Sequence, residues 1–122
     1  MNAVKDDVIK LVHKVLESAN KKFPLFHTAH EGYAVILEEV DEAEDEMRLC
    51  RANVEILWSS IRKNYGYNIS YTNKVKENAI NLAIEAIQVA AMAQKFMDSK
   101  KDPVAEKLSE IIEKEEKRIE RI

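Results

Sequence analysis

The stretch AINLAIEAIQVAAMA, residues 79–93, decides the fold because it is apolar at twelve of its fifteen positions. Its polar exceptions are Asn81, Glu85 and Gln88, which follow one another at steps of four and three residues. In a helix these steps place all three side chains in one narrow stripe. A helix that is apolar on its other sides is normally buried. We therefore expect this segment to form the central helix of a helical protein.

The composition of the whole chain favours the same class. The chain has 122 residues, of which 46% are hydrophobic and 34% charged, and this is enough for one domain with a core. It contains only two Gly and two Pro, whereas sandwiches, barrels and doubly wound sheets need many turns rich in both. We expect a single all-α domain over residues 1–122, built as a bundle of four to five helices.

Apolar periodicity and helix-breaking residues predict where the helices lie. The capping box Thr28-x-x-Glu31 marks the start of the second helix, and Pro103 follows a break and suits the first turn of the last one. The expected helices are 3–19, 28–50 with a kinked or broken extension over 53–63, 71–97 and 104–122. Residues 1–99 are expected to form the core, and the helices over about 28–50 and 71–97 to carry the functional site.

Charge and cysteine content exclude several classes of protein. The net charge of −3 gives no basic surface for nucleic acid, and the single Cys50 allows neither an internal disulfide nor a zinc knuckle. The first ten residues contain two acids where a signal peptide would begin its apolar run, and no apolar run approaches the roughly 18 residues of a membrane span. We expect a cytoplasmic protein without membrane or nucleic-acid partners.

Glu85 is the residue that calls for an explanation. A carboxylate inside a buried helix is costly unless it is paired, hydrogen-bonded or bound to a metal. The sequence leaves two possibilities open. Either a buried Lys or Arg pairs with Glu85, or Glu85 shares a metal with acids of the second helix.

The second helix is rich in such acids. At about 100° per residue, Glu38 and Glu42 lie opposite the apolar face and Glu39 lies at its border beside Glu42. This pattern also fits a plain solvated helix face. Glu39 and Glu42 form one i,i+3 pair and Glu85 and Gln88 another, so each pair faces one way. Four converging oxygen-bearing side chains favour a hard cation, Mg²⁺ or Mn²⁺.

These residues resemble a known family. Glu38-Glu39-x-x-Glu42 followed by Glu85-x-x-Gln88 resembles the E-E-x-x-E … E-x-x-D signature of the MazG-like all-α nucleoside triphosphate pyrophosphohydrolases. The segments HEGYAVILEEVDE, residues 30–42, and EAIQVAAMAQKF, residues 85–96, resemble the phage- and prophage-type branch of that family. The resemblance covers residues 26–96 and leaves out the first helix and the C-terminal tail.

The resemblance implies an enzyme that cleaves a nucleoside triphosphate to the monophosphate and pyrophosphate with Mg²⁺ as cofactor. Glu39, Glu42 and Glu85 match the family's metal-binding acids, and Glu38, the first acid of the signature, is the candidate that orients or deprotonates the attacking water. Gln88 stands where the family has Asp. The 42 residues between Glu42 and Glu85 are more than is usual, with an apparent extension over residues 51–71.

Further polar residues share the side of the third helix that carries Glu85. They are candidates for phosphate contacts, although ordinary solvation at helix ends explains the two lysines equally well: Lys74, Asn78, Asn81 and Lys95. The resemblance also implies a homodimer or higher homo-oligomer, which the largely apolar third helix predicts independently. The alternative function is that of a non-catalytic helical interaction or regulatory protein on the same scaffold, which Gln88 and the long extension favour.

Overall fold

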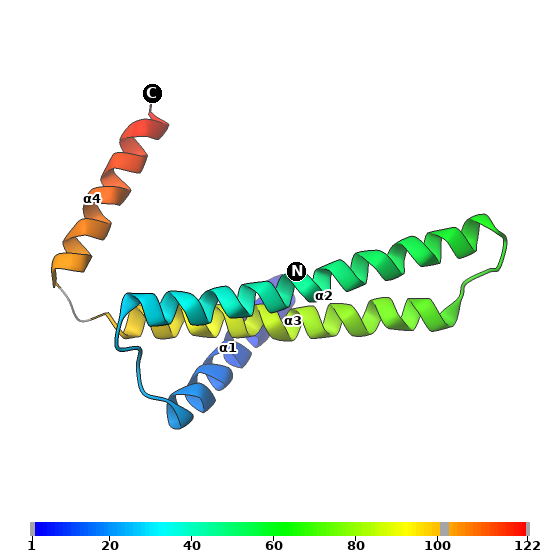
Figure 1. The fold of residues 1–122 in the computed structure, drawn as a ribbon, viewed down its shortest axis with the longest axis horizontal. Coiled ribbons are helices and arrows are strands. Elements are labelled where there is room, and N and C mark those ends of the chain that lie inside the picture. The colour runs from blue at the N-terminus through cyan, green and yellow to red at the C-terminus, as the bar shows by residue number, and fades with distance from the viewer. Residues whose placement is uncertain (1, 101–102, 122) are drawn as a thin grey trace.

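The computed structural model describes residues 2–100 and 103–121. This part of the chain contains four α-helices and no strand, which confirms the expected all-α class (Figure 1). The helices are α1 (Asn2–Lys22), α2 (Ala29–Arg62), α3 (Ile69–Asp98) and α4 (Pro103–Glu120). The predicted bounds of the first, third and last helices agree with these to within three residues.

The second helix departs from the prediction. The expected kink or break after residue 50 was wrong, because α2 is one helix of 34 residues. Residues 33–65 contain neither Gly nor Pro, so nothing in this stretch removes a backbone donor or favours a non-helical turn. The start of α2 is capped as predicted, since the Thr28 hydroxyl accepts a hydrogen bond from the Glu31 amide. The Glu31 carboxylate reaches back to the His27 amide at 3.2 Å.

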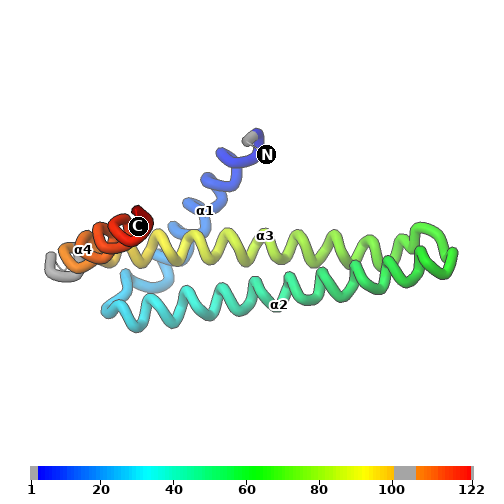
Figure 2. The backbone as a smooth tube through the Cα atoms, turned by 90° about the horizontal axis from the view of Figure 1, so that it is seen from above, coloured from blue at the N-terminus to red at the C-terminus, as the bar shows by residue number. Residues whose placement is uncertain are grey.

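The two long helices α2 and α3 form an antiparallel hairpin that dominates the molecule (Figures 1 and 2). At 1.5 Å per residue the 34 residues of α2 span about 51 Å. The turn between the helices contains three residues with positive φ, Asn64, Gly66 and Asn68. Asn68 also caps α3, because its side-chain oxygen accepts from the Tyr71 amide.

The core lies at the end of the hairpin where α2 begins and α3 ends. There α1 crosses α3 obliquely (Figure 2), and Leu16, Ala91 and Met92 are buried between the helices. The segment after α1 is tied to the end of α3, because the Phe26 amide donates to Ser99 Oγ at 2.9 Å. Gly32 permits close packing of α2 here, since a Cβ at this position would lie 2.5 Å from a ring carbon of Phe96.

Much of the apolar surface has no cover within the chain. Within one chain the third helix is not buried along its length, because Ile80 and Ile84 are 53% and 48% exposed. The reason is that α1 covers only part of α3, and α4 packs against no other helix among the described residues. In the part of the chain that the structure describes, no helix is long and apolar enough to cross a membrane.

Candidate metal centre

A line of polar side chains runs along the contact between α2 and α3. We call it the polar seam, and it consists of Glu39, Glu42, Glu46 and Asn53 from α2 and Asn78, Glu85 and Gln88 from α3. Within it, Asn53 donates to the Asn78 side-chain oxygen at 2.7 Å, and Asn78 donates to Glu46 at 3.4 Å. The acids toward the core end of the seam form the candidate metal centre.

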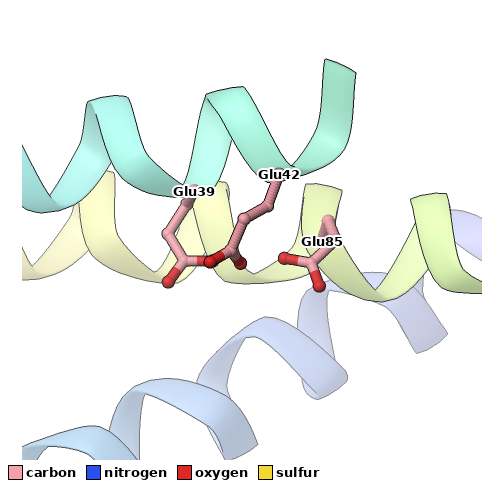
Figure 3. Close-up of side chains that lie close together, drawn as sticks. All are labelled: Glu39, Glu42 and Glu85. Carbon is pink, nitrogen blue, oxygen red and sulfur yellow. The ribbon is translucent and has the colours of Figure 1, made fainter. Parts of the chain in front are cut away.

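Glu39, Glu42 and Glu85 are the three acids that converge. Each offers a carboxylate oxygen that lies within 4.8 Å of the other two (Figure 3). Around Mg²⁺, with metal–oxygen distances of about 2.1 Å, adjacent ligand oxygens lie about 3 Å apart and opposite ones about 4.2 Å apart. The three carboxylates would therefore have to draw together by up to about 2 Å to share one such ion.

Gln88 completes the same group. Hydrogen bonding assigns its amide nitrogen to the side that faces the carboxylates, where it would donate to Glu39 Oε2 at 2.7 Å and to Glu85 Oε2 at 3.0 Å. These donations reduce the repulsion between two acids that lie side by side. Turning the amide by half a rotation would present its oxygen instead, which is a neutral ligand that hard cations accept. The donor set thus fits Mg²⁺ or Mn²⁺ without a nitrogen or sulfur ligand.

In the part of the chain that the structure describes, no basic side chain forms an ion pair with Glu85. Among the described residues the ion pairs are Arg48–Asp45 and Arg118–Glu115, both exposed and each within one helix. The possibility that a buried Lys or Arg pairs with Glu85 therefore finds no support. What remains is a carboxylate whose neighbours are two further carboxylates and one amide.

The crowding raises two pKa values in the centre. The pKa of Glu39 is raised chiefly by burial and then by the negative charge of Glu42. The pKa of Glu42 is raised chiefly because its protonated form is hydrogen-bonded to Glu85, with burial and the charge of Glu85 adding to the effect. A part of each shift is the cost of placing like charges together, which a divalent cation would remove.

Two more predicted residues lie near the centre. Glu38 is exposed, and its charge contributes to the raised pKa of Glu39 and of Glu42, although it is not one of the three converging acids. Asn81 is exposed one turn before Glu85 on α3, and it has no hydrogen-bond partner among the described residues.

The other three predicted residues are engaged elsewhere. Asn78 is held within the polar seam by Asn53 and Glu46. Lys74 is exposed, with its ammonium 4.5 Å from the centre of the Tyr71 ring. Lys95 is buried, only 3% exposed, and its ammonium donates to the Phe23 carbonyl and lies over the Phe26 ring. The structure therefore does not bring Lys74 and Lys95 to the acidic centre.

Glu46 and Asn53 belong to the seam but were not predicted. A signal for them exists, because Glu39, Glu46 and Asn53 follow one another at steps of seven residues, as do Asn78 and Glu85. A seven-residue repeat keeps side chains on the face that a neighbouring helix contacts.

Comparison with known proteins adds no identification. No protein-family model matches the chain, and no curated protein or solved structure matches it either. The resemblance to the MazG-like family therefore remains a hypothesis that rests on the motifs alone.

Proposed function

We propose that this protein is a Mg²⁺-dependent nucleoside triphosphate pyrophosphohydrolase of the MazG-like type, which converts a ribo- or deoxynucleoside triphosphate to the monophosphate and pyrophosphate. The observation that carries the proposal is the convergence of Glu39, Glu42 and Glu85 with the amide of Gln88. Three acids that pair with no described basic side chain are suited to bind a cation. A triphosphate is itself strongly negative, so it can approach these acids only when a bound cation offsets the repulsion.

Each residue has a role in this proposal. Glu39, Glu42 and Glu85 would hold Mg²⁺ or Mn²⁺, and Gln88 would turn its amide oxygen toward it. When bound, the cation neutralises charge on the phosphates and lowers the pKa of a water molecule. Glu38 would orient that water, because it lies beside the centre on α2 and is exposed to solvent. Asn81 is the candidate for a phosphate contact, since its amide is unengaged one turn from Glu85.

Pyrophosphate release tests the activity. Wild-type protein should release pyrophosphate from at least one member of a panel of ribo- and deoxynucleoside triphosphates with Mg²⁺, and not in EDTA. Glu39→Gln should lose this activity, because it removes one metal-binding charge. Glu44→Gln makes the same chemical change on an exposed residue of the same helix and should behave as wild type. Wild-type protein that is inactive across the whole panel would refute the hydrolase proposal.

The proposal includes a homodimer or higher homo-oligomer. Exposed large apolar side chains continue along the hairpin beyond the core, among them Val54, Ile56, Trp58 and Ile61. A surface that exposes this many large apolar side chains normally marks an interface. Light scattering at micromolar concentration should give at least twice the 14.1 kDa mass of one chain, and a monomer mass would contradict it.

The same apolar surface also favours a second candidate function, that of a non-catalytic helical interaction protein. The two functions differ in their need for the acids. An interaction protein would keep its oligomeric state and partners when Glu39 is replaced by Gln, and it would release no pyrophosphate.

A further inference from the structure

The last helix, α4, has an apolar face that nothing in the described part of the chain covers. Leu108, Ile111, Ile112 and Ile119 are 55–62% exposed, and their spacing places them on one stripe of the helix. At 18 residues α4 is only slightly longer than the roughly 12–15 residues below which isolated helices are marginal in water, and helices in proteins gain most of their stability by packing an apolar face. This helix therefore needs a surface to lie on.

An apolar groove of matching character lies between α1 and α3. It has a volume of about 220 Å³ and is lined by six apolar residues, Val8, Val12, Ala83, Ala86, Ile87 and Ala90. By the 100° step of a helix, its alanines lie roughly opposite the polar seam on α3. The groove is thus separate from the candidate metal centre. Its alanine floor would let another helix approach closely, since the distance between packed helices falls as the contacting side chains become smaller.

We infer that α4 leaves the position it has in Figure 1, where it packs against no other described helix, folds back along α3 and places its apolar face in this groove of the same chain. Four residues, 99–102, separate α3 from α4, and loops of about two to five residues join antiparallel helices. Both helices rise equally per residue, so positions equally far from the loop come level with each other. Ile111 comes level with Ala90, and Ile119 lies within one residue of Ala83.

In this register the apolar residues of α4 lie level with the groove residues of α3, and α4 is long enough to reach along the whole groove. The connection to the same chain decides between this groove and that of a second copy. A short linker gives the helix an effective concentration of about a millimolar near its own groove. A second copy that is free at micromolar concentration competes poorly with it, and a partner already held in a homodimer would have to bring its own groove within reach of the same four-residue linker.

Disulfide trapping tests the contact. In a Cys50→Ser background, Ala90→Cys combined with Ile112→Cys should form a disulfide within one chain under mild oxidation. The product should migrate as a compact monomer on a non-reducing denaturing gel. The matched control combines Ala90→Cys with Glu110→Cys, which lies at the same level on the opposite face of α4, and should form far less. A disulfide between two chains would overturn the proposal in favour of a second copy, and trapping no better than the control would overturn it altogether.

Hydrogen exchange gives a second measurement that needs no cysteines. In wild-type full-length protein the amides of residues 107–120 should exchange at least tenfold more slowly than expected for an isolated helix. Leu108→Asp should abolish this protection, because it places a charge on the docking face. Ser109→Asp adds the same charge one residue away, beside the stripe, and should retain it. Unprotected amides in wild type, or equal loss in both variants, would refute docking.

Discussion

Where α1 crosses the α2–α3 hairpin, Leu16, Ala91 and Met92 are buried, whereas beyond this crossing the only buried residue described is Ser60. We call the first region the covered end and residues 49–80 the bare arm. Both are made of the same two amphipathic helices. The difference is a third helix, which is present at one end and missing at the other (Figure 1).

The two regions are also held together by different interactions. The covered end packs apolar side chains and rings against each other, as Gly32 and Phe96 do. In the bare arm the helices are joined by side-chain hydrogen bonds, including Asn53–Asn78 and Asn68–Ser60. Hydrogen bonds contribute less net stability than burial but depend more on geometry. The covered end is thus stabilised by burial, whereas the bare arm is aligned by hydrogen bonds and leaves large apolar side chains exposed.

The largest expected effect is on activity, and it compares a substitution in the candidate metal centre with one in the bare arm. Loss of a residue that only supports a metal ligand lowers metal affinity or activity by about 10–100-fold. Glu85→Gln removes a proposed ligand itself, so it should lower the rate of pyrophosphate release by at least about 100-fold. In EDTA the variant should melt no lower than wild type, because the change relieves repulsion among the acids. Glu55→Gln, exposed in the bare arm, should leave activity unchanged. A variant that melts far below wild type in EDTA would instead give Glu85 a structural role.

The next effect compares the two glycines by urea unfolding. Gly32→Ala should destabilise the covered end by roughly 1–3 kcal/mol, because the new methyl group would overlap the Phe96 ring. Gly66→Ala has open space around the new methyl group, and its cost of about 1 kcal/mol should come only from the positive φ of 79°. Equal stability of Gly32→Ala and wild type would mean that the rings do not pack against α2 as described.

A smaller effect tests the hydrogen bonds of the bare arm. Asn78→Ala should lower the free energy of unfolding by about 1 kcal/mol, since it leaves Asn53 and Glu46 without a partner. The matched control is Asn81→Ala on the same helix, which removes no hydrogen bond and should change stability by less than about 0.5 kcal/mol. If the two variants are equally stable, the seam does not hold the arm.

The smallest effect is a pH dependence confined to the covered end. The raised pKa values of Glu39 and Glu42 mean that the folded protein binds more protons than the unfolded chain above the ordinary value of 4.5. Without metal, stability should therefore fall as pH rises through the window between the unfolded and the raised folded pKa values. Metal ligands must be deprotonated, so the increase in Tm caused by Mg²⁺ should grow across the same window.

Melting curves in EDTA and in millimolar Mg²⁺, recorded between about pH 4.5 and pH 7, measure both trends. Glu39→Gln should reduce them together, because it removes one of the two shifted groups. An Mg²⁺ effect on Tm that does not change with pH would argue against carboxylate ligands with raised pKa values.

The sequence predicted the candidate centre better than the surroundings of its helices. Glu39, Glu42, Glu85 and Gln88 could be grouped because i,i+3 spacing fixes the direction of each pair, and the lone acid of an apolar helix needs partners. The continuity of α2 was missed, although the chain between Gly32 and Gly66 contains no helix-breaking residue.

Lys95 illustrates what periodicity cannot supply. Its angle around α3 is close to that of Gln88, so the pattern grouped it with the centre. It lies seven residues further along, about 10 Å, where the segment between α1 and α2 covers it. Periodicity gives the direction of a side chain around its helix, and only the folded chain decides which segment lies over it.

The polar seam also determines how far the two long helices can slide past each other. Apolar heptads alone would tolerate a shift of α3 by seven residues along α2 in the direction that brings residue 92 to the place of residue 85, because one apolar side chain replaces another at most contacts. That shift would set Glu42 against Met92 and separate it from Glu85, leaving a carboxylate against a thioether. The shifted hairpin is therefore less stable than the correct one, even where its surface is in contact with water. A cation bound by residues of both helices would stabilise the correct alignment further, because the shifted hairpin would lose its ligands from one helix.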